Sequence, residues 1–146
     1  MKIKRNYTKK KYLKDVESII RFIENFETQK FRVIYAVPRG GVHLGKLLSN
    51  RLKIELKTSL NDVLCHIIKH KIQKDNVLIV DDIVDTGKTL LKIRQDFPDS
   101  LFISLWRNNT CNFPPNMSLN LSNDNDWIVF PWEDKKEETK VNGTKI

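Results

Sequence analysis

The stretch VLIVDDIVDTGKTL, residues 77–90, decides the fold because it reads as a buried strand, a polar turn and the start of a helix. The four residues from Val77 to Val80 are all apolar, which is typical of a strand buried on both faces of a parallel sheet. Asp81, Asp82 and Asp85 follow, and ligands of open parallel sheets bind beyond the carboxyl ends of the strands. The stretch therefore predicts a ligand site at the end of this strand.

The turn Thr86-Gly87-Lys88-Thr89 has the features of a phosphate site. Backbone N–H groups at the start of a helix point outward, and the helix dipole adds positive charge. Gly87 allows the backbone to approach a ligand closely, and the two threonine hydroxyls add donors. The turn is not the P-loop of nucleoside-triphosphate enzymes, because Asp82 stands where that motif requires its first glycine.

The paired acids Asp81 and Asp82 suggest a second part of the same ligand. Two neighbouring carboxylates can accept hydrogen bonds from vicinal hydroxyls such as those of ribose, or can hold a metal ion. A helix cap is the simpler explanation for one of these acids, but it does not explain three acids beside one phosphate turn. We therefore expect a ligand that carries a phosphate together with hydroxyls or a bound metal.

The rest of the chain alternates between strand-like and helix-like segments, which predicts an α/β fold. Helical spacing of apolar residues marks residues 9–25, 44–52 and 90–97, and apolar runs predict strands at 32–37, 62–68, 100–106 and 126–133. Residues 108–126 carry prolines and asparagines and are predicted to be mostly loop. We expect one domain, residues 1–133, with a mainly parallel sheet flanked by helices, followed by a polar, disordered tail at 134–146.

Composition excludes several classes of protein. The chain has 146 residues, 40% hydrophobic and 30% charged, which suits one globular domain with a sizeable core. No apolar run reaches membrane-spanning length, and the N-terminus lacks the apolar block of a signal peptide. Cys65 and Cys111 lack the spacing of a zinc or redox site, so we expect reduced thiols in a cytoplasmic protein.

The net charge of +8 is concentrated near the N-terminus, where seven basic residues and no acid lie between Lys2 and Lys14. Such a run can attract nucleic acid. A solvated arm or helix end is the more common explanation, and positive potential also favours an anionic substrate. Nucleic acid is therefore less favoured as a partner than an anionic substrate.

Three segments together resemble the type I phosphoribosyltransferases, and most closely their xanthine-guanine branch. Residues 77–90 resemble the loop that binds phosphoribosyl pyrophosphate: an apolar strand, two acids, a third acid and T-G-x-T. VIYAVPRGGVHLG, residues 33–45, resembles the family's pyrophosphate loop, and DWIVFPWE, residues 126–133, resembles the base-binding end of the xanthine-guanine enzymes. The three segments occur in the family's order, and the resemblance covers residues 7–133.

The resemblance implies a role for each matching residue. Asp81 and Asp82 would hold the ribose hydroxyls directly or through Mg²⁺, and Asp85 would accept a proton from the purine N7. The 5-phosphate would bind to the turn formed by Asp85, Thr86, Gly87, Lys88 and Thr89, and the pyrophosphate to Arg39 and Gly40. In a small C-terminal base-binding hood, Trp127 would stack on the base and the Ile128 backbone would meet its edge. Arg39 would also be catalytic, because it stabilises the leaving pyrophosphate. The resemblance further implies a cis or strained bond between Pro38 and Arg39.

Two departures from the family pattern affect the expected activity. Arg107 and Asn108 occupy the place where purine enzymes of the family carry a lysine that meets the 6-oxo group, so these two are the predicted donors to the base. The mobile loop that closes over the substrate is shortened to about residues 68–76. We expect a homo-oligomeric (dimeric or tetrameric) enzyme of purine salvage that transfers phosphoribosyl to guanine, xanthine or hypoxanthine. The alternative is a regulatory or nucleic-acid-binding protein on the same fold, with weak or no transferase activity.

Overall fold

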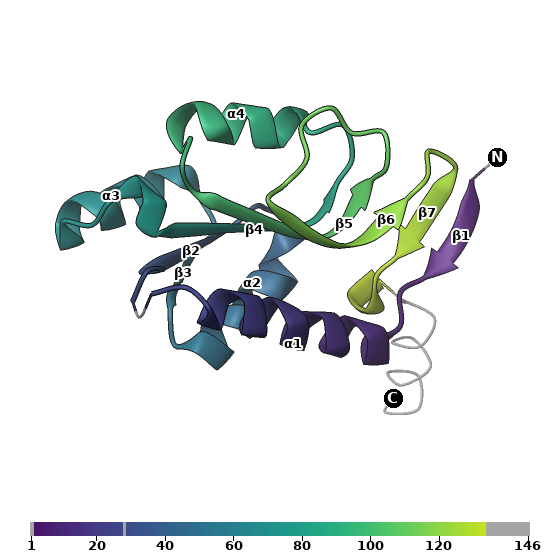
Figure 1. Ribbon diagram of the computed structural model, residues 1–146, viewed down its shortest axis with the longest axis horizontal. Helices are drawn as coiled ribbons and strands as arrows, with labels where there is room; N and C mark the ends of the chain where they lie inside the picture. Colours follow the sequence, from purple (N-terminus) through teal and green to yellow (C-terminus); the bar gives the residue numbers. More distant parts are fainter. Residues whose placement is uncertain (1, 28, 134–146) are drawn as a thin grey trace, which may run out of the picture.

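A five-stranded parallel sheet forms the centre of the protein (Figure 1). The structure is a computed structural model that describes residues 2–27 and 29–133. Along the sheet the strand order is β3-β2-β4-β5-β6, and each neighbouring pair is parallel. The strands are β2 (Val33–Ala36), β3 (Glu55–Lys57), β4 (Val77–Val84), β5 (Leu101–Asn108) and β6 (Met117–Ser122). The predicted α/β class and parallel sheet are confirmed.

Helices cover both faces of the sheet, which explains why β2 and the first half of β4 are apolar without a polar face. The helices α1 (Lys9–Glu24) and α2 (Gly41–Leu52) lie on one face, and α3 (Leu60–His70) and α4 (Lys88–Asp96) lie on the other. Adjacent strand residues pack on opposite faces of the sheet, each of which carries a hydrophobic core: Ile34 packs with α1 and α2, whereas Val33 packs with α3 and α4. Both side chains are fully buried.

The order of the strands places a switch point between β2 and β4. From β2 the chain moves outward to β3, and it then returns past β2 to add β4, β5 and β6 on the other side. The connections after β2 and after β4 therefore lead away from each other and leave a crevice at the carboxyl ends of these strands, where ligands of such sheets bind. Arg39 follows β2, and Asp81 and Asp82 lie in the carboxyl half of β4.

A second, two-stranded sheet stands beside the main one and joins the two ends of the described chain. The strand β1 (Ile3–Asn6) pairs in parallel with β7 (Asp126–Val129), which is followed by the short helix η2 (Pro131–Glu133). This unit is the predicted C-terminal hood, completed by an N-terminal strand that the sequence analysis treated as part of a basic arm.

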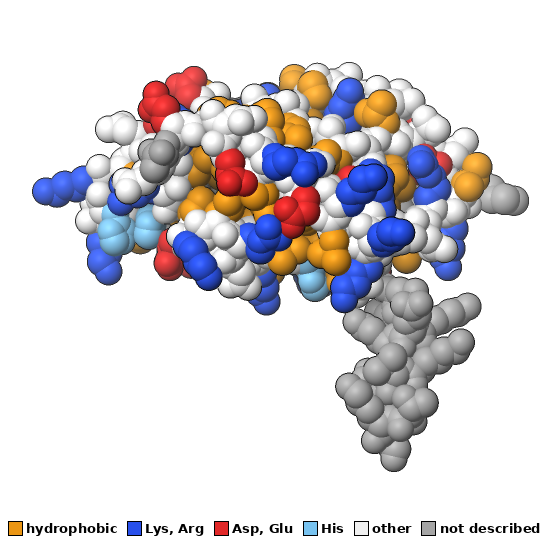
Figure 2. Space-filling model, turned by 60° about the horizontal axis from the view of Figure 1, so that its bottom comes forward, with side chains coloured by type: hydrophobic (Ala, Val, Ile, Leu, Met, Phe, Trp, Pro, Cys, Tyr) orange, Lys and Arg blue, Asp and Glu red, His pale blue; other side chains and the backbone are white. Residues whose placement is uncertain are grey.

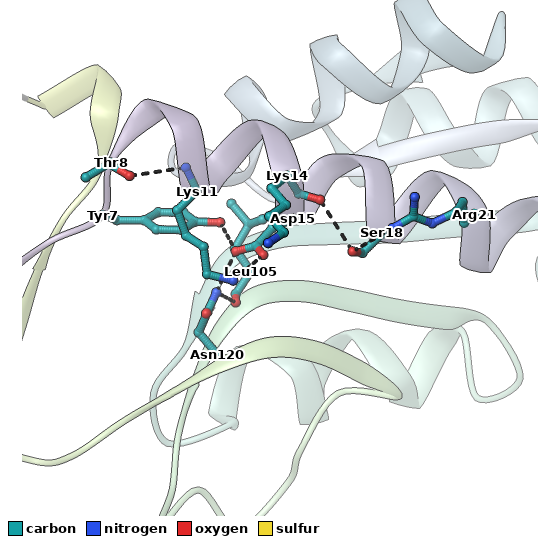
Figure 3. Close-up of polar contacts among 9 residues, drawn as sticks. All are labelled: Tyr7, Thr8, Lys11, Lys14, Asp15, Ser18, Arg21, Leu105 and Asn120. Carbon is teal, nitrogen blue, oxygen red and sulfur yellow. Dashed lines mark hydrogen bonds and ion pairs between the residues drawn. The ribbon is translucent and has the colours of Figure 1, made fainter.

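The N-terminal segment is fixed to the domain by one buried carboxylate, Asp15 (Figure 3). Asp15 is 2% exposed and accepts hydrogen bonds from the Tyr7 hydroxyl at 2.5 Å, Lys11 Nζ at 2.7 Å and Asn120 Nδ2 at 2.9 Å. A buried charge is stable only when it is paired and hydrogen-bonded, and these three donors meet that condition. The contacts join the segment before α1, α1 itself and β6, so the N-terminal segment is part of the folded domain.

Two predictions about secondary structure were wrong. Residues 62–68, predicted as a strand, lie in α3, whose cap Ser59 accepts a hydrogen bond from the backbone N–H of Asp62 at 3.2 Å. Val63 and Ile67 are four residues apart and pack on the sheet, and a short apolar run does not distinguish this arrangement from a strand. The predicted loop at 108–126 contains β6, whose polar side chains hid its strand pattern.

The basic run at residues 2–14 forms β1, which was not predicted, and the first part of α1, whose start near residue 9 was. Arg5 forms an ion pair with Asp126 at 2.9 Å, and Lys11 forms one with Asp15 at 2.7 Å. These two acids, one far along the chain and one a helical turn away, balance part of the charge of the basic run. The predicted tail at 134–146 lies outside the described residues. Among the helices that the structure describes, none combines the length and the apolar character needed to cross a membrane.

Candidate functional site

Two adjacent carboxylates, Asp81 and Asp82, occupy the carboxyl half of β4. Asp81 Oδ1 accepts a hydrogen bond from the Asp82 N–H at 2.8 Å, and Asp82 Oδ1 accepts one from the Ile83 N–H at 2.7 Å. Both side chains are partly buried. Burial, together with the hydrogen bond and negative charge of Asp82, raises the pKa of Asp81 from its ordinary 3.8 to about 9. This shift favours a proton on the pair over two full negative charges side by side.

The first turn of α2 lies directly against these acids because two glycines leave room for it. A Cβ atom at Gly40 would overlap the Asp82 carboxylate, and one at Gly41 would lie 2.6 Å from the Val80 carbonyl oxygen. A side chain at Gly41 would push this turn away from the β4 backbone, and one at Gly40 would displace the Asp82 carboxylate. The Pro38–Arg39 peptide bond is cis, as the sequence analysis predicted. The structure thus brings the Arg39-Gly40 loop and the Asp81-Asp82 pair together at the switch point.

The turn from Asp85 to Thr89 completes this end of the sheet. Gly87 has φ of +91°, a backbone conformation that side chains disfavour, and a Cβ atom there would lie 2.6 Å from the Phe113 carbonyl oxygen. The Thr86 hydroxyl accepts a hydrogen bond from the Lys88 N–H at 3.3 Å, and the N-cap residue of α4, Gly87, has no side chain to cap the N–H groups that follow. A small cavity of about 150 Å³ lies within the turn and reaches Asp81. Uncapped N–H groups beside a cavity are suited to an anion.

Asp85 is exposed, and its carboxylate accepts a hydrogen bond from a buried neighbour. Asn108, at the end of β5, donates from Nδ2 to Asp85 Oδ1 at 3.3 Å and to Asp124 Oδ1 at 2.9 Å. Its own Oδ1 accepts from the Thr110 backbone N–H at 2.9 Å and from the Thr110 hydroxyl at 2.7 Å. Sequence reasoning named Asp85 and Asn108 as site residues, but it did not connect them to each other or to Asp124.

The remaining predicted residues lie on β5, which neighbours β4, and on β7 of the two-stranded sheet. Arg107 is half-buried and pairs with Val84 in the β4–β5 ladder. Val84 is the residue directly before Asp85. Trp127 and Ile128 are in β7, where the Trp127 side chain is 58% exposed and Ile128 is buried. An exposed indole such as that of Trp127 is available to stack on a planar ligand.

The sequence matches the phosphoribosyl transferase domain family over residues 5–97, which is more than half of the chain. The chain belongs to the phosphoribosyltransferase family. The xanthine-guanine phosphoribosyltransferase of Roseobacter denitrificans is 24% identical over 121 residues, which cover 70% of this chain and 69% of that protein.

Solved structures agree with this assignment. The purine phosphoribosyltransferase from Pyrococcus horikoshii aligns with a TM-score of 0.68 at 26% identity, covering 90% of this chain and 94% of that one. The xanthine-guanine-hypoxanthine phosphoribosyltransferase of Helicobacter pylori aligns with a TM-score of 0.69 at 24% identity, covering 95% and 99% of the two chains, and so shares the fold. This phosphoribosyltransferase therefore has the architecture that its family resemblance implied.

The donors present in this phosphoribosyltransferase fit a metal ion that arrives with its ligand. Among the described residues, no group of three or more His, Cys, Asp and Glu side chains could hold a metal. Mg²⁺ is usually bound through one or two carboxylates together with substrate phosphate oxygens. The carboxylates of Asp81 and Asp82 would supply the protein's share of such a set.

The raised pKa of Asp81 leads to a prediction about stability. An acid whose pKa is higher in the folded state stabilises that state most at low pH, and the benefit is lost as pH rises from about 4 towards 9. We expect Asp81→Asn to raise the melting temperature at pH 8 by roughly 3 °C, equivalent to about 1 kcal/mol, with less effect at pH 5. Thermal unfolding at both pH values measures this, with exposed Asp96→Asn as the control. An equal shift at both pH values would contradict it.

Proposed function

We propose that this protein transfers the phosphoribosyl group of phosphoribosyl pyrophosphate to a 6-oxopurine base and releases pyrophosphate. The proposal rests chiefly on one observation: the Asp81-Asp82 pair, the Arg39-Gly40 loop and the turn after Asp85 meet at the switch point of the sheet. A sugar carrying a phosphate at one end and a pyrophosphate at the other has the shape and charge to occupy all three. The relatives named above, one called a xanthine-guanine phosphoribosyltransferase and one a purine phosphoribosyltransferase, support the same substrate class.

In this proposal the sugar lies over the end of β4. The 5-phosphate binds to the N–H groups and threonine hydroxyls of residues 86–89, and the cavity in the turn receives it. Asp81 and Asp82 face the ribose hydroxyls and would hold Mg²⁺. When bound, Mg²⁺ supplies positive charge that neutralises the pyrophosphate oxygens. Release of the proton held by Asp81 would accompany that binding.

The chemical step breaks the bond between C1 of ribose and the pyrophosphate oxygen, and the bonding electrons leave with pyrophosphate. A bond from C1 to the purine nitrogen forms, and the purine gives up a proton that Asp85 accepts. Arg39 stabilises the charge that builds up on the leaving group. No covalent bond to the protein is needed, because positioning and charge stabilisation supply the acceleration.

The base would bind between the hood and the end of β5. Trp127 offers its exposed face for stacking, the Ile128 backbone meets the edge of the base, and Arg107 donates to the 6-oxo group. Arginine carries only donors, so it favours an oxo group over the amino group of adenine. The lysine that purine-type members of the family usually carry at this position would act in the same way, which makes the replacement by arginine compatible with a 6-oxopurine substrate.

The alternative of a nucleic-acid-binding protein on this fold receives less support from the surface. Lys2 Nζ donates to the Asp124 carbonyl oxygen at 2.7 Å, and Arg5 and Lys11 pair with acids, so part of the basic run is used within the protein. Figure 2 shows Lys and Arg side chains scattered among acidic and apolar ones, without a continuous basic stripe on the face it presents. The cytoplasmic location and the dimeric or tetrameric assembly remain predictions.

Pyrophosphate release tests the proposal when each component is omitted in turn. The purified protein is supplied with phosphoribosyl pyrophosphate, Mg²⁺ and guanine, and pyrophosphate is measured over time. We expect release only when all three are present. Release that does not depend on guanine would indicate hydrolysis, and no release with any purine would contradict the proposed function in favour of a regulatory or binding protein.

A further inference from the structure

Asn108 is the buried polar residue nearest to the proposed chemistry. Its residue exposure is 6%, and its amide makes four hydrogen bonds, two from Nδ2 and two to Oδ1. An asparagine side chain has two N–H donors and two acceptor lone pairs, so these contacts use its full capacity. Asn108 therefore has no donor left for a purine, although its position after Arg107 first indicated a contact with the base.

The four contacts also fix which way the amide points. The two carboxylates, Asp85 and Asp124, require donors, and the Thr110 N–H requires an acceptor. Turning the amide over would place its oxygen against both carboxylates and its N–H groups against another N–H. The NH₂ group is thereby held between two acids that would otherwise repel each other.

We propose that Asn108 is a positioning residue that orients Asp85 for proton transfer, with Asp124 as its anchor. The inference rests on the proposed function, because it assigns a role to Asp85 in that reaction. The hydrogen bond engages Oδ1 of Asp85 and leaves Oδ2 for the base. Its length of 3.3 Å is at the long end for N–H···O, and such bonds in ligand-free sites often tighten when the substrate binds.

Asp85 needs such a partner because its own surroundings do little to hold it. The residue is exposed and lies on the turn between β4 and α4. Among the residues that the structure describes, Asn108 is the one whose side chain donates a hydrogen bond to the Asp85 carboxylate. An unrestrained carboxylate would sample several rotamers, and a misplacement of about 1 Å can slow a reaction by about a hundredfold.

The anchor Asp124 is itself held in place by the N-terminal strand. Asp124 lies in the turn between β6 and β7, where its carbonyl oxygen accepts from Lys2 Nζ at 2.7 Å. The next carbonyl along, that of Asn125, accepts from the Ile3 N–H at 2.6 Å. The chain of contacts therefore runs from β1 through this turn and Asn108 to Asp85, and it connects the hood to the proposed proton acceptor.

Replacing Asn108 by alanine tests the inference against its neighbour Asn109. Asn109 makes a similar amide contact, to Asn123 Oδ1 at 2.8 Å, without touching Asp85. We expect Asn108→Ala to lower kcat roughly 10- to 100-fold, with the KM for phosphoribosyl pyrophosphate changed less than about threefold. Asn109→Ala should leave both values close to wild type. A loss of kcat and phosphoribosyl pyrophosphate binding in equal measure, or no loss of kcat, would overturn the proposal.

A second pair of variants keeps the test valid if Asn108→Ala does not fold. Asp124 is exposed, and Asp124→Asn retains an oxygen that can accept from Asn108, whereas Asp124→Ala removes it. We expect Asp124→Ala to lose kcat by about tenfold and Asp124→Asn to lose much less. Equal kcat in the two variants would contradict the positioning role. If the wild type forms no nucleotide in the same assay, the proposed function fails; if the wild type is active and these variants match it, only the role of Asn108 fails.

Discussion

Replacing Asp85 by asparagine should slow turnover by about a hundredfold or more, because the residue would lose its ability to accept a proton from the purine. Asparagine has almost the same size, and its oxygen can still accept the hydrogen bond that Asn108 gives to Asp85 Oδ1. The substitution therefore leaves the surrounding contacts in place while removing the base. Single-turnover measurement of nucleotide formation would report the chemical step directly.

Binding of phosphoribosyl pyrophosphate should change much less in this variant. The paired acids Asp81 and Asp82, the Arg39-Gly40 loop and the threonines of the turn all remain. Titration calorimetry with phosphoribosyl pyrophosphate and Mg²⁺ would measure this, with Asp96→Asn as the matched control at an exposed acid on α4. Equal losses in binding and in turnover would show that Asp85 maintains the loop rather than taking part in proton transfer.

Arg107→Ala should remove most of the preference for 6-oxopurines over adenine. Stacking on Trp127 is open to any purine, so the choice of base depends on hydrogen bonds at its edge. A buried donor or acceptor left without a partner costs about 1–3 kcal/mol, which corresponds to a preference of roughly ten- to a hundredfold. Competition between guanine and adenine, expressed as a ratio of kcat/KM values, would measure the preference in wild type and variant.

Lysine is the informative conservative replacement at this position. Like arginine it has only donors, so Arg107→Lys should keep the preference for a 6-oxo group even if turnover changes. Arg21→Ala, at an exposed arginine on α1, controls for a general loss of positive charge. If Arg107→Ala retains the wild-type ratio of guanine to adenine, another residue reads the 6-position and the assignment of Arg107 is wrong.

The local parts of the site could be predicted from sequence because each lies within one short segment. The strand Val77–Val80, its two acids and the turn at Thr86–Thr89 are contiguous, and their chemistry does not depend on what packs against them. The close approach of Gly40 to Asp82 could be anticipated only through the family resemblance. Composition and periodicity alone do not place two segments about forty residues apart in contact.

What the sequence could not show is which distant polar groups meet. The link from Asp85 through Asn108 to Asp124 exists because β6 pairs with β5 and its following turn lies over the end of β5. That pairing was missed because β6 carries polar residues such as Ser118 and Asn120, and apolar periodicity is the main signal for a strand. The short strands β1 and β3 were missed for a related reason, since three or four residues give too little pattern.

The products formed from a mixture of bases test the central claim most directly. The protein is incubated with phosphoribosyl pyrophosphate, Mg²⁺ and equal amounts of guanine, hypoxanthine, xanthine and adenine, and the nucleotides are separated and identified by mass. We predict the 5′-monophosphates of one or more of the 6-oxopurines, formed in equal amount to pyrophosphate, with the adenine nucleotide at least tenfold lower, in line with the cost of one unmatched hydrogen bond. No nucleotide from any base, or adenine nucleotide as the main product, would contradict the account.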